Sequence, residues 1–179
     1  LEQHTKLLFS NAINSRVDGY IAHLIKDDKG VAILSYPTIN LNEADIYNKS
    51  SKELVSTHNI KNHELHITPC SFKSTVNAQA PNVMGSEVML LDFDGTKDGG
   101  KINIDIIASV EKLIRGLGVF PSAIHTSGSI SNGVPHVHIY YKFDRHITGQ
   151  DFEKLIKYRK DLAIAVDADK SFGDKAHKI

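Results

Sequence analysis

Apolar and polar positions along this chain follow two periods, and each period predicts one kind of element. Apolar residues at helical spacing predict helices over residues 5–14, 103–117 and 148–163. Short apolar or alternating runs predict strands over residues 19–25, 31–36, 64–68, 88–93, 121–126 and 134–143. Polar segments separate these runs, among them the small, polar stretch 127–133, which is predicted to be a loop. The pattern therefore predicts an α+β fold with an antiparallel or mixed sheet.

The second half of the chain has the more regular pattern. Its order of strand, helix, strand, strand and helix is typical of a ferredoxin-like or RNA-recognition-like module, which we place at residues 64–179. Residues 1–63 are less regular and are expected to form an N-terminal α/β lobe. The chain begins at Leu1 rather than at Met and ends at Ile179 without a turn signal. We therefore expect a single domain that is a fragment of a longer protein.

The composition gives information about the cellular compartment and the membrane association of the protein, but little about its activity. Lys and Arg total 21, as do Asp and Glu, so that a basic surface for nucleic acid has to be local. Cys70 is the single cysteine, which excludes an internal disulfide and is typical of a reducing cytoplasm. No apolar run approaches the roughly 20 residues that span a bilayer, so no membrane association is expected.

Two aspartates at the end of an apolar strand are the strongest chemical signal. Asp92 and Asp94 follow the run 88–91 with one residue between them. Side chains alternate along a strand, so both carboxylates are expected on one face. Neighbouring like charges repel, and Mg²⁺ or Mn²⁺ bound between them removes that penalty. The alternative is a strand end and turn before Gly95, with no bound metal.

A second cluster combines small residues with histidines. Small residues such as Ser127 and Gly128 let backbone N–H groups approach a ligand closely, which suits phosphate oxygens. His136 and His138 share one face of the following strand, where His138 is placed to donate to the same phosphates. An ordinary loop and structural histidines are the alternative interpretation.

A third cluster lies after the last predicted helix. Asp167 and Asp169 are both candidates for a third carboxylate beside Asp92 and Asp94. Three carboxylates that hold one or two metal ions are suited to phosphoryl transfer. The alternative is that these aspartates are no more than polar residues at a helix end.

Together these segments resemble the catalytic domain of archaeo-eukaryotic primases, in particular plasmid and phage primase-polymerases. Residues 88–95 resemble the Asp-x-Asp motif of that family, and residues 126–129 with 138–144 resemble its Ser-x-His motif. The upstream segment 65–73 is similar to a strand and loop that precede the first motif in plasmid and phage members. The resemblance covers roughly residues 64–179. The chain departs from the family by the insertion 130–135, which leaves open whether His136 or His138 is the equivalent residue.

The resemblance implies a DNA-dependent primase or polymerase that acts in plasmid or phage replication. Asp92, Asp94 and Asp169, with Asp167 as the alternative third acid, would bind Mg²⁺ or Mn²⁺. The implied partners are a single-stranded DNA template, an NTP or dNTP, and a helicase domain or protein. The residues that would contact the nucleotide phosphates are Ser127, Gly128, His138 and Lys142.

Three other functions are kept open. The pair His136 and His138 resembles the metal-binding pair of HUH-type rolling-circle replication endonucleases, for which Tyr158 is the candidate nucleophile. Asp92 and Asp94 resemble the opening motif of haloacid-dehalogenase-type phosphatases, with Asp92 as the phosphoryl acceptor. A nucleic-acid-binding module without catalysis would use a basic helix face and exposed aromatic residues on the sheet. The residues predicted for that basic face are Lys154, Lys157, Arg159 and Lys160.

Overall fold

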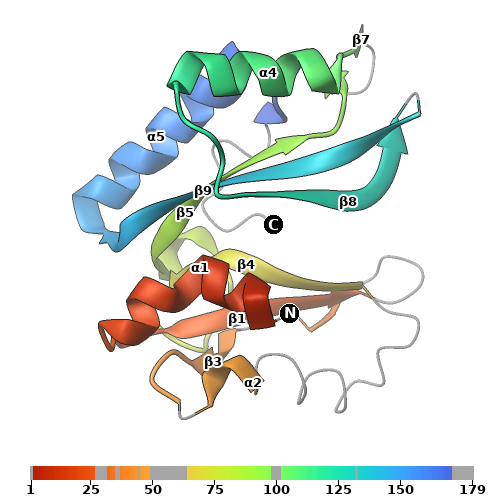
Figure 1. Cartoon of the computed structure of the whole chain (residues 1–179). Coiled ribbons are helices and arrows are strands. Elements are labelled where there is room, and N and C mark those ends of the chain that lie inside the picture. The colour runs from red at the N-terminus through yellow and green to blue at the C-terminus, as the bar shows by residue number, and fades with distance from the viewer. Residues whose placement is uncertain are drawn as a thin grey trace. The chain divides into compact units, whose positions relative to one another are not determined.

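The computed structural model describes residues 2–26, 32–34, 37–43, 45–48, 64–97, 102–131 and 133–170. Within these ranges the protein is an α+β structure with an antiparallel sheet, as predicted (Figure 1). It divides into two compact units. The first unit consists of the described parts of Leu1–Val88 with Phe143–Phe152, and the second of those of Met89–Lys142 with Glu153–Ala176. The predicted boundary after residue 63 stays a prediction.

The first unit combines a strand layer with α1. Its neighbouring strands follow the order β2-β1-β4-β5, and β3 pairs with β1. The pairs β1–β2, β1–β3, β1–β4 and β4–β5 are all antiparallel. The bounds are α1 Glu2–Asn14, β1 Tyr20–Lys26, β2 Ala32–Leu34, β3 Pro37–Asn40, α2 Ile46–Asn48, β4 Glu64–Phe72, the 3₁₀ turn Ala80–Asn82 and the first part of β5 Val83–Phe93.

The strand β4 is longer than predicted, because it continues through Pro69. A proline has no N–H for a sheet ladder, so it is expected at a strand end, an edge or a bulge. Here the β1–β4 pairing shifts between Ile21, which lies opposite Ser71, and His23, which lies opposite Ile67. Pro69 lies within that irregularity, and its carbonyl accepts a hydrogen bond from the Ser86 hydroxyl. The bulge therefore accommodates the proline without ending the strand.

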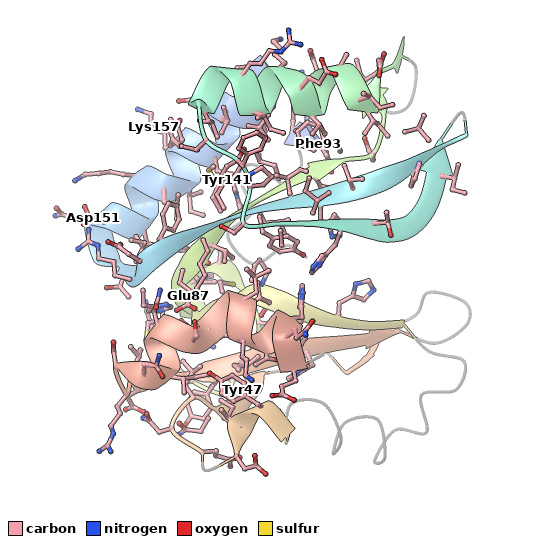
Figure 2. The ribbon with its side chains drawn as sticks, in the orientation of Figure 1. Tyr47, Glu87, Phe93, Tyr141, Asp151 and Lys157 are labelled. Carbon is pink, nitrogen blue, oxygen red and sulfur yellow. The ribbon has the colours of Figure 1, made fainter. Side chains whose placement is uncertain are left out.

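A buried carboxylate joins α1 to β5 in the first unit. Glu87 is fully buried on β5 and lies beside α1 (Figure 2). Its Oε1 accepts from the backbone N–H of Asn11 at 3.1 Å, and its Oε2 accepts from that of Ala12 at 2.9 Å. The Asn11 side chain in turn donates to the carbonyl of Phe143 at 2.8 Å. A buried charge needs such hydrogen bonds to be tolerated, so Glu87 fixes where α1 packs.

A second buried ionisable group of the first unit is His23. Its side chain is fully buried on β1, and neither ring nitrogen has a hydrogen-bond partner among the described residues. Burial lowers the pKa of His23 to about 4, because the charged imidazolium loses its hydration. The neutral ring therefore belongs to the folded state.

His23 makes the first unit sensitive to acid. The unfolded chain has a His pKa of about 6.5 and binds more protons than the folded chain between that pH and about 4. The stabilisation by neutral His23 is complete above pH 6.5 and is lost as the pH falls through this window. We expect His23→Leu to reduce the drop in urea-unfolding free energy between pH 7 and pH 4.5. The same drop in both proteins would contradict this assignment.

The second unit contains the remaining strands and two long helices. Its strands follow the order β5-β9-β8, and β6 pairs with β7 in a separate two-stranded ladder. In Figure 1, α4 and α5 lie on one side of the strands of this unit. The bounds are β6 Thr96–Lys97, β7 Ile102–Asn103, α4 Ile106–Leu117, β8 Ala123–Ser131, β9 Val134–Thr148 and α5 Gly149–Ala165. No helix within the described residues is long and apolar enough to cross a bilayer.

Alternation along the strands gives this unit one apolar face. Leu91 and Phe93 of β5, with Ile139 and Tyr141 of β9, are all buried. Figure 2 shows Phe93 and Tyr141 between the strands and the helices, and the Tyr141 hydroxyl donates to the carbonyl of Val119, just after α4. The intervening residues of the same strands therefore point to the opposite face, which carries the candidate site.

Local signals explain where the two long helices begin or end. The Asp105 side chain caps α4 by accepting from the N–H of Ala108 at 3.1 Å, and Gly118 ends α4 with a left-handed φ of 66°. At the end of α5, the N–H of Ala168 donates to the carbonyl of Ala163 at 2.9 Å, and Asp167 between them has a φ of 58°. This is the hydrogen bond of a Schellman motif, with Asp167 in the position that glycine usually occupies.

Two predictions in this unit were wrong. The stretch 127–131 is not a loop, because β8 continues to Ser131. Its pairing with β9 shifts between Thr126, opposite Val137, and Ile130, opposite Pro135, so that three residues oppose one in a bulge. Arg159 does not belong to an exposed basic face, since its side chain is only 4% exposed.

Candidate functional site

The site is built around Asp92, near the end of β5. Its Oδ1 lies 3.6 Å from Nε2 of His138 on the neighbouring strand β9, and the two side chains are 16% and 19% exposed. The distance is longer than a hydrogen bond, and the contact is an ion pair only when the imidazole is protonated. These two residues belong to separate sequence motifs that lie 46 positions apart (138 − 92). The structure brings them together on the face opposite the helices.

His125 extends this cluster onto β8 and was not singled out from the sequence. It is the direct cross-strand partner of His138, so both imidazoles lie on one face. The His125 ring centroid is 5.1 Å from that of Tyr140, and the His138 ring centroid is 6.4 Å from it. A signal was present, because His125 lies within the predicted strand 121–126, but only the β8–β9 register shows which residue it faces.

Tyr140 lies beside the two histidines and is almost fully buried. Burial, with a smaller contribution from the Asp92 carboxylate, raises the pKa of Tyr140 to about 12. The phenol is therefore protonated at neutral pH, where it supports the imidazoles and is a poor nucleophile. Tyr140 and Tyr141 are 4% and 7% exposed, so neither offers a ring for base stacking of the RNA-recognition type.

The two late aspartates have different surroundings. The backbone N–H of Asp169 donates to the carbonyl of Asp92 at 2.8 Å, which holds the two residues next to each other. Asp167 occupies the left-handed position after α5, and its Oδ2 lies 3.6 Å from Nζ of Lys112 on α4. The structure thus places Asp169 beside Asp92 and gives Asp167 a role in ending a helix.

The other predicted residues surround this centre less closely. Asp94 follows β5 directly and is half-buried, and Gly95 turns the chain with a φ of 71°. Lys142 lies two residues beyond Tyr140 on β9, hence on the same face, and its backbone N–H donates to Ser122 Oγ at 2.9 Å. Ser127 and Gly128 belong to the bulge in β8.

The donor chemistry of the site fits a hard divalent cation. No group of three His, Cys, Asp or Glu side chains within the described residues is arranged to hold a metal ion. Mg²⁺, however, is commonly held by one or two carboxylates together with water and substrate phosphates. Asp92 and Asp94 are carboxylates of that kind.

Comparisons with known proteins add no relative. The chain matches no protein-family model, no curated protein and no solved structure. Arguments about its function therefore depend on the geometry of these residues and on the motif resemblance described above.

The two late aspartates are expected to respond differently to substitution. With the nucleotidyl transfer that the motif resemblance implies as the readout, Asp167→Gly should leave incorporation unchanged, because glycine adopts the left-handed conformation without a Cβ penalty. Asp169→Ala should lower the incorporation rate by about a hundredfold if its carboxylate supports the Asp92 centre. Single-turnover primer extension compares the two variants. A larger loss in Asp167→Gly would show that the third acid has been misassigned.

Proposed function

We propose that this protein is a metal-dependent nucleotidyltransferase that makes or extends primers on a DNA template, as a primase-polymerase does. Two contacts of Asp92 support the proposal: its carboxylate lies 3.6 Å from Nε2 of His138, and its backbone carbonyl accepts a hydrogen bond from the N–H of Asp169. These residues come from three separate motifs of the sequence. The sheet is antiparallel, as the RNA-recognition-like module of the proposal requires, although that finer fold remains part of the proposal.

In the proposed reaction the carboxylates would bind the metal, and the other site residues would bind the nucleotide phosphates. The carboxylates of Asp92, Asp94 and Asp169 would hold Mg²⁺ or Mn²⁺, which supplies charge neutralisation and lowers the pKa of the attacking 3′-hydroxyl. His138 would orient the nucleotide phosphates beside Asp92. Residues in a bulge do not take part in the regular hydrogen bonds between strands. The backbone N–H groups of Ser127 and Gly128 would therefore be able to donate to phosphate. Lys142 would add positive charge.

The partners of the proposed reaction follow from this assignment. They are a single-stranded DNA template and an NTP or dNTP, with a helicase as the partner in plasmid or phage replication. The exposed side chains of Lys154, Lys157 and Lys160 on α5 are a local basic surface, although the buried Arg159 is not part of it. Figure 2 shows Lys157 on the outer side of α5.

The geometry of the site gives less support to the rolling-circle endonuclease and to the phosphatase. Tyr158, the candidate nucleophile of a rolling-circle endonuclease, is half-exposed on α5, which lies on the helix side of the strands (Figure 1). His138 points to the opposite face of β9. A haloacid-dehalogenase-type phosphatase requires a βαβα series around its opening motif, whereas β5 lies in an antiparallel sheet.

One incubation separates these functions. The protein is mixed with single-stranded DNA, labelled nucleotides and Mn²⁺, and the products are resolved on a denaturing gel. Extended or newly made oligonucleotides would support nucleotidyl transfer. A covalent protein–DNA adduct without incorporation would refute it and favour the endonuclease. Phosphate release with an aspartyl-phosphate at Asp92 would favour the phosphatase.

A further inference from the structure

We propose that His125 is a second phosphate-binding side chain, which acts beside His138 on the incoming nucleoside triphosphate. The proposal rests on the proposed function, because it takes the nucleotide to lie next to Asp92. It adds a residue that the motif resemblance does not include. His125 is half-buried on β8 and lies on the same face of the second unit as His138.

Asp92, His138 and His125 lie on three strands that follow one another in the sheet. These strands are β5, β9 and β8, in that order. Asp92 contacts His138, and His138 is the direct cross-strand partner of His125. The three side chains therefore form a row across the strands, with steps of about 4.8 Å from one strand to the next.

The chemistry of the row changes from one end to the other. A carboxylate at β5 suits a divalent cation, whereas the imidazoles of β9 and β8 have ring N–H groups that donate to anions. A triphosphate whose metal-bound end lies at Asp92 would meet His138 and then His125 in turn. Two successive phosphates would thus each meet an imidazole donor, one on β9 and one on β8, beyond the metal-bound end at Asp92.

Tyr140 makes the imidazole pair a preformed feature. Its buried ring contacts both His125 and His138, so each imidazole has an aromatic support that restricts its orientation. Groups that are held in place before binding lose less conformational freedom when the ligand arrives. The burial of Tyr140 also removes a stacking surface, which favours phosphate over a base as the ligand of this face.

The competing explanation is that His125 only packs against Tyr140. His125→Phe tests this directly, because phenylalanine keeps an aromatic ring against Tyr140 and removes the N–H donor. His125→Ala removes both. His66→Ala, which changes a histidine of β4 in the first unit, is the matched control.

The experiment measures the affinity of dATP with Mn²⁺, the affinity of adenosine, and the kcat and KM of primer extension. We expect His125→Phe and His125→Ala to weaken dATP binding and raise KM by about tenfold each, with kcat changed less than twofold. Adenosine binding and the His66→Ala control should be unchanged. Thermal unfolding confirms that each variant is folded.

Four results would overturn the proposal. Wild-type affinity in His125→Phe would show that the ring has a packing role only, and equal weakening for adenosine would show that phosphate is not the contact. Incorporation by the wild type with unchanged dATP affinity in both variants would refute the role of His125 and leave the proposed function intact. Failure of the wild type to bind or incorporate dATP would refute both.

Discussion

Replacing both Asp92 and Asp94 by alanine is expected to reduce nucleotide incorporation by about a thousandfold or more, while DNA binding changes little. The two carboxylates are the proposed metal ligands, and losing several kcal/mol of charge stabilisation in the transition state corresponds to this factor. Primer extension with Mn²⁺ measures the rate, and a gel-shift assay measures DNA affinity. The fold should persist, because charged groups that converge at active sites commonly cost stability.

Asp161→Ala is the matched control for this double variant. Asp161 is an exposed aspartate of α5 in the same unit, so its removal changes the net charge without touching the proposed site. We expect its incorporation rate to equal that of the wild type. Full activity in the Asp92 and Asp94 double variant would defeat the assignment of the site.

Replacing Glu87 by alanine is expected to lower the free energy of unfolding by about 3 kcal/mol. The fully buried carboxylate accepts hydrogen bonds from the N–H groups of Asn11 and Ala12, and its removal leaves both groups facing a cavity. Urea unfolding followed by circular dichroism measures the change. Glu87→Gln keeps the shape but presents an amide N–H₂ to one of the donors, so we expect it to be intermediate.

Glu111→Ala is the control for the stability measurement. Glu111 pairs with Arg115 one turn later on α4, with both side chains exposed, and such pairs contribute about 0.5 kcal/mol or less. A loss in Glu87→Ala no greater than that in Glu111→Ala would show that the buried carboxylate does not hold α1 against β5.

The fold class was predictable because the periodic runs are long and have clear end signals. The helix predicted over residues 103–117 is confirmed as α4, with Asp105 at its start and Gly118 at its end. Boundaries were less predictable where pairing overrides a local signal. Pro69 and the small residues 127–129 read as strand breaks, but the structure takes up each irregularity in a bulge.

The sequence indicated most residues of the candidate site, but it did not show which of them lie close together. Alternation placed Asp92 and His138 on strand faces, but only the sheet order shows that they touch. His125 was missed because cross-strand register depends on the bulge that follows it. The spacing favoured Asp169 over Asp167 as the third acid, and that choice stays a prediction. The structure adds what spacing could not show, namely that Asp167 ends α5 and that the backbone N–H of Asp169 donates to the Asp92 carbonyl.

Direct measurement of Mn²⁺ binding in the presence of dATP tests the central claim, which is that Asp92 is a ligand of the metal in a metal–nucleotide site. Electron paramagnetic resonance counts free Mn²⁺ as protein is added, first without and then with dATP. We predict that dATP strengthens Mn²⁺ binding by the wild type and that Asp92→Asn removes this gain, while Asp161→Asn retains it. Equal Mn²⁺ binding by the wild type and Asp92→Asn in the presence of dATP would contradict the account.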